Sequence, residues 1–238
     1  MTRPALWLVP GLMCDQSVWT PLLPALSEVA DCQVVDHGEA DDLGQMAQQL
    51  LAQAPARFAL AGHSMGGRVA LEVMRRAPER VTHLGLFDTG YLPKAAGAAG
   101  EEEVRKRQAL LAIARAQGVR AMAAEWVKGM VAPHRLQDSA LIASILDMFS
   151  RKSADTFARQ IRALLARPDG SDVLRSVQVP TLVLCGAEDS WSTPAQHEAL
   201  SALIPAQPPV CRIEAAGHMA MMESPDAVAQ AMRAWLVR

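Results

Sequence analysis

The sequence has few aromatic residues and no excess of charge of either sign. Phenylalanine, tryptophan and tyrosine make up 4% of its 238 residues, and 23 lysines and arginines nearly balance 25 aspartates and glutamates, for a formal net charge of −2. Binding to nucleic acid generally needs a strong basic excess, because the protein must neutralise phosphates. The balance of charge therefore argues against nucleic acid as the main partner.

Long apolar runs are also missing. None reaches the roughly 18 residues that a membrane-spanning helix requires. The first apolar run, Ala5–Val9, is five residues long and ends at Pro10-Gly11. It is too short for the core of a secretory signal peptide. We therefore expect a soluble, cytoplasmic protein with no membrane partner.

Cysteine is scarce, and the four that occur are scattered without the Cys-x-x-Cys spacing of metal or redox sites: Cys14, Cys32, Cys185 and Cys211. A zinc site would need histidine and cysteine partners at close spacing, and the sequence has none. Most of these cysteines lie in or beside apolar segments, where a free thiol behaves as a small core residue. We expect no disulfide framework, no metal and no cofactor.

Half of the residues are apolar, which provides for a well-covered core, and the length favours one elaborated domain. Short apolar runs alternate with longer amphipathic stretches, a pattern typical of buried parallel strands with helices on both faces. The runs are Ala5–Val9, Gln33–Val35, Phe58–Ala61, Val81–Phe87, Thr181–Cys185 and Val210–Ile213. We predict an α/β fold with a mostly parallel sheet of about six strands.

Three amphipathic segments show helical spacing. Leu43–Ala54 and Gly67–Ala77 are two of them, and the second stops at Pro78, which favours a helix end. The third, Pro225–Val237, follows Ser224 directly. A serine before a proline at the first helical position is typical of a helix start, so we predict that Ser224 caps this helix.

The stretch 91–170 breaks the alternation. A glycine- and alanine-rich linker, Lys94–Gly100, is followed by helix-like sequence without a strand signal. We predict four helices, at Glu101–Gln117, Ala121–Met130, Asp138–Phe149 and Ala154–Ala166. A helical insertion between parallel strands usually lies over the carboxyl edge of the sheet, where ligands bind. The predicted domains are a core of residues 1–90 and 171–238 and a helical cap of residues 91–170.

The predicted cap is more basic than the rest of the chain. Residues 101–169 contain 12 basic and 8 acidic side chains. One interpretation is a lid with a mild preference for anionic substrates, but a solvated helical surface explains the charge at least as well. Five apolar residues of the cap are candidates either to line an apolar substrate pocket or to form the cap's own core: Met122, Trp126, Met130, Met148 and Phe149.

The segment Gly62–Gly67, with the sequence GHSMGG, follows an apolar run and precedes a helical pattern. This is the strand–turn–helix context of a nucleophile elbow, G-x-S-x-G. The glycines are needed because side chains two positions either side of Ser64 would collide with neighbouring backbone. The sharp turn lifts the serine hydroxyl out of the sheet and places a helix N-terminus beneath it.

A serine hydroxyl is too weakly acidic to attack unaided, so it needs a base that is oriented by an acid. His218 follows the last apolar run and Asp189 follows the one before, so both lie on loops at the same sheet edge as Ser64. We predict that His218 takes the serine proton and that Asp189 fixes its tautomer. Two other carboxylates remain possible as the acid: Glu188, next to Asp189, and Asp88, which follows an earlier strand.

Attack on a carbonyl also requires an oxyanion hole, made of two N–H groups aimed at the developing negative oxygen. One should be the backbone amide of Met65, directly after the serine. The other should come from the loop after the first strand, where Gly11 allows close approach and Pro10 has no N–H to donate. Leu12 is the candidate, with Met13 second.

On four segments the chain resembles the α/β-hydrolase superfamily, over nearly its full length: Leu8–Trp19, Gly62–Gly67, Val179–Pro194 and Ala216–Pro225. The resemblance implies a twisted, mostly parallel sheet with a helical cap inserted after the strand that ends near Asp88. Ser64, Asp189 and His218 match the positions of the superfamily's triad, and Leu12 and Met65 match its oxyanion amides.

The chain departs from that pattern in two places. Pro10-Gly11 stands where the superfamily often has His-Gly, so the oxyanion loop is expected to differ in shape. Little sequence precedes Ala5, so we expect a six-stranded sheet without the two antiparallel edge strands that many members carry.

A serine at the elbow excludes the superfamily members that use aspartate there, the haloalkane dehalogenases and epoxide hydrolases. The resemblance then implies a serine hydrolase that forms an acyl-enzyme on a small-molecule acyl substrate, a carboxylic ester, thioester or lactone. Three alternatives remain: a carbon–carbon bond hydrolase of ring-cleavage products, an enol-lactonase or perhydrolase, and a non-catalytic binding member. The natural substrate and the oligomeric state are left open.

Overall fold

The computed structural model describes residues 3–237, and in them one six-stranded sheet in which all neighbouring strands run parallel. The strands are β1 (Ala5–Val9), β2 (Asp31–Val34), β3 (Phe58–His63), β4 (Val81–Phe87), β5 (Thr181–Gly186) and β6 (Val210–Ile213). Their order across the sheet is β2-β1-β3-β4-β5-β6. The predicted α/β fold with six strands is confirmed, and each predicted run overlaps one strand.

The strand order reverses between β1 and β3. The chain leaves β1 toward the β2 edge and leaves β3 toward the β4 side, so the carboxyl ends of β1 and β3 meet where the order reverses. Ligands bind at such points in open α/β sheets. Val9 at the end of β1 pairs with Gly62 of β3. This register brings the loop after β1 beside the turn after β3.

Burial explains why the central strands are continuous apolar runs. All six residues of β3 and four of the five in β1 are buried, because helices cover both faces. The edge strand β2 alternates between exposed and half-buried positions. Its mixed pattern is the reason that the predicted start, Gln33, lies two residues after the observed one, Asp31.

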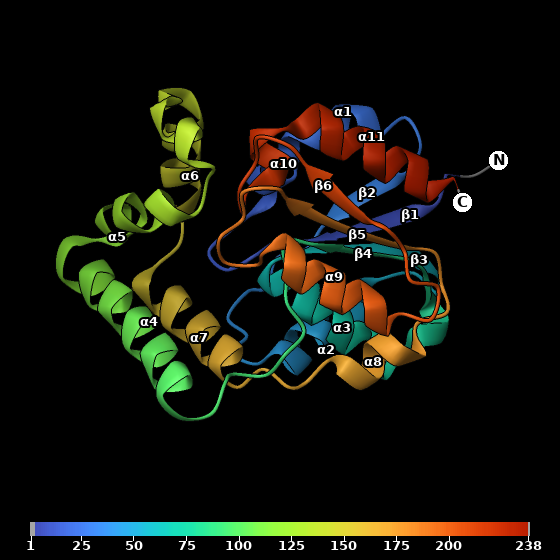
Figure 1. Ribbon diagram of the computed structural model, residues 1–238, viewed down its shortest axis with the longest axis horizontal. Coiled ribbons are helices and arrows are strands. Elements are labelled where there is room, and N and C mark those ends of the chain that lie inside the picture. Colours follow the sequence, from blue (N-terminus) through green and yellow to red (C-terminus); the bar gives the residue numbers. More distant parts are fainter. Residues whose placement is uncertain (1–2, 238) are drawn as a thin grey trace.

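Helices cover both faces of the sheet (Figure 1). One face carries α1 (Leu23–Leu26), α10 (Ala220–Glu223) and α11 (Pro225–Leu236), and the other carries α2 (Leu43–Gln53), α3 (Met65–Arg76), α8 (Ser171–Ser176) and α9 (Pro194–Leu203). Short 3₁₀ turns lie at Gln16–Val18, Thr20–Leu22 and Pro78–Arg80. The helix predicted from Gly67 begins earlier, at Met65, directly after Ser64.

Ser224 is the N-cap residue of α11, as predicted, but it caps the helix through its backbone and not through its side chain. Pro225 does occupy the first turn, but the Ser224 hydroxyl makes no capping hydrogen bond. The Ser224 N–H instead donates to Ala220 O at 2.9 Å, because the residue also closes the short helix α10. Its backbone is therefore shared between two helices, and only its carbonyl serves α11, accepting from Val228 N–H at 3.2 Å.

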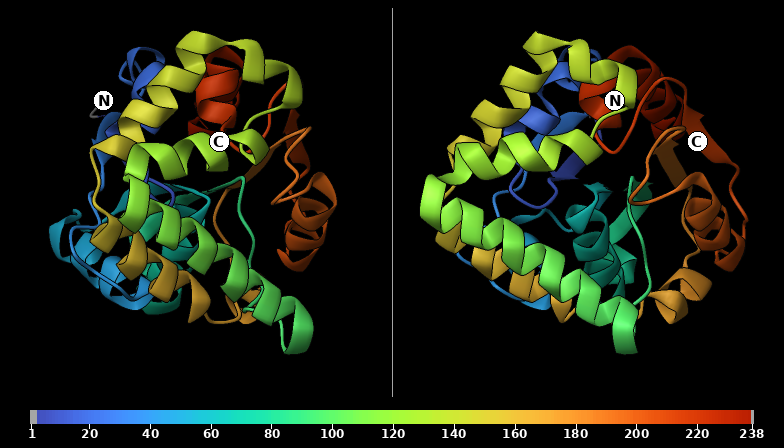
Figure 2. Two further views of the ribbon diagram at one scale, coloured as in Figure 1. Left: turned by 90° about the vertical axis from the view of Figure 1, so that its left-hand side faces the viewer. Right: turned by 60° about the vertical axis from the view of Figure 1, so that its left-hand side comes forward.

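Between β4 and β5 the chain inserts a separate group of helices, which we call the helical insertion (residues 91–170). It contains α4 (Gly97–Gln117), α5 (Val119–Trp126), α6 (Ser139–Ser150) and α7 (Ala154–Leu165), with 3₁₀ turns at Val127–Gly129 and Pro133–Gln137. These helices stand to one side of the sheet, and the views of Figure 2 show α4 and α7 side by side.

The predicted helix bounds in the insertion differ most from the structure at the start of α4 and at the end of α5. α4 starts at Gly97, inside the expected linker, because its alanines are strong helix formers that outweigh the glycines. α5 ends at Trp126 instead of Met130, because the chain tightens there into the 3₁₀ turn at Val127–Gly129.

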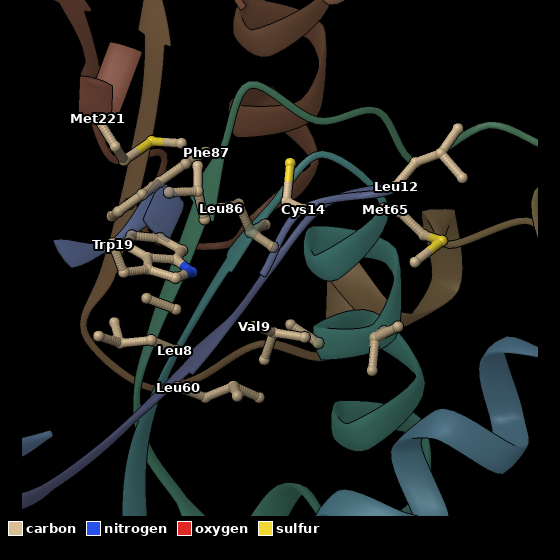
Figure 3. Close-up of a cluster of buried hydrophobic side chains, with 14 of the residues drawn as sticks. Leu8, Val9, Leu12, Cys14, Trp19, Leu60, Met65, Leu86, Phe87 and Met221 are labelled. Carbon is tan, nitrogen blue, oxygen red and sulfur yellow. The ribbon is translucent and has the colours of Figure 1, made fainter. Parts of the chain in front are cut away.

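The core is continuous beneath the carboxyl edge of the sheet. Figure 3 shows Leu8, Leu60 and Leu86 from β1, β3 and β4, with Leu12 and Met65 to their right. All four cysteines of the described chain are free. Within residues 3–237 no helix combines the length and the apolar character needed to cross a membrane, and no group of three or more potential ligands is placed to hold a metal.

Candidate active site

Ser64 lies on a strained turn between β3 and α3. Its backbone has φ 54° and ψ −116°, a conformation that L-residues rarely adopt. The Ser64 N–H donates to Phe87 O at 2.9 Å, and the Thr89 hydroxyl donates to Ser64 O at 2.7 Å. A side chain at Gly66 would put its Cβ 2.1 Å from Val9 O, so only glycine fits there. Neighbouring strands thus hold the turn that presents the serine.

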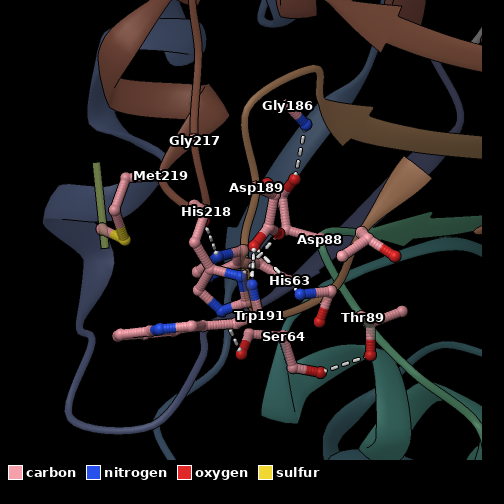
Figure 4. A network of polar contacts seen from close by, with 12 residues as sticks. His63, Ser64, Asp88, Thr89, Gly186, Asp189, Trp191, Gly217, His218 and Met219 are labelled. Carbon is pink, nitrogen blue, oxygen red and sulfur yellow. Dashed lines mark hydrogen bonds and ion pairs between the residues drawn. The ribbon is translucent and has the colours of Figure 1, made fainter. Parts of the chain in front are cut away.

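A continuous chain of hydrogen bonds links Ser64, His218 and Asp189 (Figure 4). The Nε2 atom of His218 lies 2.8 Å from Ser64 Oγ, and its Nδ1 atom lies 2.8 Å from Asp189 Oδ2. A carboxylate can only accept, so Nδ1 carries the proton and Nε2 is free to accept from the serine. The arrangement has the geometry of a nucleophile, a base and an orienting acid.

Asp189 is buried but remains the charged partner. Its Oδ1 atom accepts from the N–H groups of Trp191 at 2.8 Å and Ser192 at 2.9 Å. Burial alone would raise its pKa, but attraction to His218 and these hydrogen bonds outweigh it and lower the pKa below the ordinary aspartate value. The carboxylate can therefore stabilise a positive charge that forms on His218.

The two alternative acids lie elsewhere. Asp88 is fully buried, and its Oδ1 atom accepts from Gly186 N–H at 2.8 Å, while within the described residues Oδ2 has no partner. Burial and repulsion from Asp189 raise the pKa of Asp88 well above its ordinary value, which favours its neutral form. Glu188 is partly exposed and lies 3.7 Å from His134. Neither contacts His218 through a hydrogen bond in the described part of the chain.

The residues that carry the candidate oxyanion amides, Leu12 and Met65, line the same cavity as Ser64. Among residues 3–237 neither N–H donates to another protein group. The second candidate from the β1 loop, Met13, is ruled out because its N–H donates to Gln160 Oε1 at 2.8 Å. Gly11 allows the loop to pass close to the elbow, since a Cβ there would lie 3.2 Å from Ser64 Cβ.

Several histidines near the site have structural partners. The Nε2 atom of His63 lies 2.9 Å from His218 O and donates to it, because a carbonyl only accepts. His197 accepts from Thr89 N–H at 3.0 Å through Nε2. These contacts position the loops that carry Ser64 and His218. We find no role for either ring in proton transfer.

Two buried residues that sequence reasoning missed hold the site to the helical insertion. Gln160 of α7 binds the β1 loop, as described above. Glu223 accepts from Gly217 N–H at 2.9 Å and Met219 N–H at 3.1 Å through Oε1, and from Ala132 N–H at 2.8 Å through Oε2. A lone glutamate directly after the apolar segment Met219–Met222 was the available signal, but its partner Ala132 lies far away in the sequence.

A cavity of about 610 Å³ opens above Ser64 and His218, between the sheet edge and the insertion. Three of the five predicted pocket residues line it, Trp126, Met130 and Phe149. Met122 and Met148 do not, and the prediction for them was wrong. Both are completely buried and belong to the hydrophobic core.

Aromatic rings connect the insertion to the candidate base. Trp191, which sequence reasoning missed, stacks on Trp126 with ring centroids 5.7 Å apart and an interplanar angle of 21°. Its ring also lies 5.0 Å from that of His218. Trp126 in turn lies 5.5 Å from Phe149 and from Phe157. These rings form an apolar wall that reaches the site.

With this geometry established, comparison with known proteins identifies the family. Residues 7–231 match the Alpha/beta hydrolase family, and the chain belongs to it. The chain is 31% identical over 236 residues to the dihydrolipoyllysine-residue acetyltransferase component of the acetoin cleaving system of Pseudomonas putida, covering 97% of this chain and 59% of that protein. It spans between 18% and 59% of the length of the first curated relatives that it matches.

Two solved structures share the whole architecture. A thermophilic esterase from Thermogutta terrifontis has a TM-score of 0.85 and 27% identity, covering 99% of this chain and 90% of that one. The enol-lactonase from Burkholderia xenovorans LB400 has a TM-score of 0.86 and 23% identity, covering 100% and 93%. The second likeness extends to the fold alone.

Proposed function

We propose that the protein is a serine hydrolase of small carboxylic esters, thioesters or lactones, acting through an acyl-enzyme on Ser64. One observation carries the proposal: His218 lies 2.8 Å from both Ser64 Oγ and Asp189 Oδ2, and this chain of contacts opens into a cavity. The similarity to a thermophilic esterase at 27% identity supports ester hydrolysis over the carbon–carbon and perhydrolase alternatives.

The proposed reaction begins with the substrate carbonyl oxygen toward the Leu12 and Met65 amides. Ser64 Oγ attacks the carbonyl carbon while His218 Nε2 takes its proton, and Asp189 stabilises the imidazolium. Collapse of the tetrahedral intermediate breaks the bond to the alcohol or thiol, which receives the proton from His218. Water then repeats the sequence on the acyl-enzyme, releasing the acid and restoring Ser64.

The helical insertion is proposed to act as a cap that shapes the acyl site. Trp126, Phe149 and Trp191 provide an apolar wall of the cavity. A non-catalytic binding member is disfavoured, because such a protein would have no need to keep a buried, hydrogen-bonded carboxylate behind a histidine. The cavity volume fits a small molecule better than a long lipid chain.

The test is hydrolysis of p-nitrophenyl esters with acyl chains of two to twelve carbons. We expect wild-type turnover with an optimum at short chains, and a loss of at least about 10³-fold in Ser64→Ala. Ser144→Ala is the matched control, because Ser144 is an exposed serine of α6 whose hydroxyl donates to Ala140 O within its own helix. No wild-type turnover, or equal turnover in Ser64→Ala, would overturn the proposal.

A further inference from the structure

The cavity wall contains three arginines as well as its aromatic rings: Arg68 of α3, Arg107 of α4 and Arg167, just after α7. Within residues 3–237, one carboxylate lies directly among them, that of Glu103. Arg167 pairs with it through two hydrogen bonds of 2.7 and 2.8 Å, and Arg107 through two of 2.8 and 3.0 Å. Glu103 is thus fully occupied by two of the three guanidinium groups.

Arg68 is the group left over. Its Nη1 atom donates to Leu92 O at 2.8 Å, and in the described part of the chain its other N–H groups have no partner. Burial and the nearby Arg167 lower the pKa of Arg68 to about 9, and Glu103 opposes them only in part. The guanidinium of Arg68 therefore lines the cavity without enough neighbouring negative charge to neutralise it.

The other charges on this wall do not supply the missing anion. Glu102 and Lys106 also line the cavity, and Lys106 Nζ lies 3.6 Å from Glu102 Oε1. Glu102 is further bound by Arg105 through two hydrogen bonds of 2.6 and 2.7 Å. It is thus fully paired on its own helix. The three guanidinium groups carry three positive charges and Glu103 carries one negative charge, so this wall of the cavity has a net positive charge.

Arg68 lies close to the reacting centre. It lies in the first turn of α3, four residues along the chain from Ser64, which immediately precedes that helix. Both residues line the cavity. A group bound to Arg68 would therefore sit only a short chain away from a carbonyl carbon at Ser64.

We propose that Arg68, backed by Arg107 and Arg167, binds a carboxylate on the acyl part of the substrate. Guanidinium groups bind carboxylates through two parallel hydrogen bonds, and Arg68 has the free N–H groups to do so. The substrate class is then an ester, thioester or lactone whose short acyl chain ends in a carboxylate. This inference rests on the proposed function, and it assigns the basic character of the insertion to substrate selection.

The test compares two methyl esters that differ only in the group at the far end of the acyl chain, monomethyl glutarate and methyl pentanoate, followed by pH-stat titration. We expect wild-type kcat/KM to be about 10- to 100-fold higher for the glutarate ester, the range of a charge-assisted hydrogen bond. Arg68→Met should abolish that ratio, and Arg68→Lys, which keeps the charge but loses the fork, should give an intermediate ratio. The exposed Arg105→Met is the control, with an unchanged ratio.

A binding measurement separates this inference from the proposed function. Calorimetry of glutarate with Ser64→Ala should show binding that is lost in Ser64→Ala/Arg68→Met, with thermal melts to verify folding. Turnover of methyl pentanoate without preference for monomethyl glutarate would overturn the inference and leave the proposed function standing. If neither ester is turned over, the proposed function fails, and glutarate binding that depends on Arg68 would still support the carboxylate site. Absence of binding would overturn the inference.

Discussion

At the residue scale, two buried aspartates lie near the candidate base and differ in their partners. Asp189 accepts from His218 and two backbone N–H groups, whereas Asp88 accepts from Gly186 and is pushed toward its neutral form. The sequence left both open as the acid, since each follows a strand at the same edge. The choice depends on loop geometry, which a single sequence encodes only weakly.

Exchanging each aspartate for asparagine should separate their roles. Asp189→Asn should lower kcat/KM by about 10³-fold, because an amide can neither fix the Nδ1–H tautomer nor stabilise the imidazolium. Asp88→Asn should change it less than about threefold, because a neutral side chain already fits that position and its oxygen can still accept from Gly186. Steady-state kinetics on the best p-nitrophenyl ester measures both. The reverse pattern would show that Asp88 is the acid.

At the element scale, the loop that carries His218 is bound to the insertion. His218 N–H donates to Met130 O at 2.8 Å, and Glu223 joins Ala132 N–H to the amides on either side of His218. The Met130–Ala132 segment is therefore held against the histidine loop from two directions. A shift of this segment would be transmitted to the candidate base.

Glu223→Gln tests this coupling. Both carboxylate oxygens of Glu223 accept from backbone N–H groups, and glutamine replaces one of these oxygens with an NH₂ group, which cannot accept. At least one of the hydrogen bonds is therefore lost. We expect kcat to fall about 10- to 100-fold with KM changed less than about threefold, and the free energy of unfolding to fall by about 1–3 kcal/mol. Kinetics and urea unfolding measure the two effects. Glu198→Gln, at an exposed position of α9 where the carboxylate pairs with Arg212, is the control. Lower stability with unchanged kcat would mean that Glu223 only supports the fold.

Local signals explain which elements could be predicted. The strands, α2, α3 and the serine turn were accessible because apolar runs, helical spacing and glycines act over a few neighbouring residues. The role of Ser224, the end of α5 and the burial of Met122 and Met148 depend on what each element packs against. Tertiary contacts determine whether a side chain caps a helix and whether a methionine lines a pocket. The periodicity of the sequence does not reveal those contacts.

At the scale of the whole molecule, the insertion is fixed to the core at several points around the cavity. Gln160 holds the β1 loop, Met130 and Ala132 hold the histidine loop, and Arg151 pairs with Asp15 at 2.7 Å. The sequence indicated the insertion and its place over the sheet edge. It could not indicate these attachments, because their partners lie far apart along the chain.

Buried neutral histidine should also make the stability of the whole molecule depend on pH. Burial and the nearby His218 lower the pKa of His63 from 6.5 to about 3. Between these values the unfolded chain binds a proton that the folded protein does not, so this stability is fully present above pH 6.5 and is lost as pH falls toward 3. From pH 7 to pH 5 the loss attributable to His63 should be about 2 kcal/mol.

Replacing His63 with glutamine isolates this contribution, because the glutamine amide can still donate to His218 O but does not titrate. We expect the free energy of unfolding of wild type to fall by about 2 kcal/mol more than that of His63→Gln between pH 7 and pH 5, measured by urea unfolding.

Asp88 and Glu223, whose raised pKa values act in the opposite direction, are common to both proteins and cancel in the comparison. His134→Gln, at an exposed site, should follow wild type. Parallel pH profiles for wild type and His63→Gln would mean that the folded protein admits a proton at His63, and that the contact between the elbow and the His218 loop opens under mildly acidic conditions.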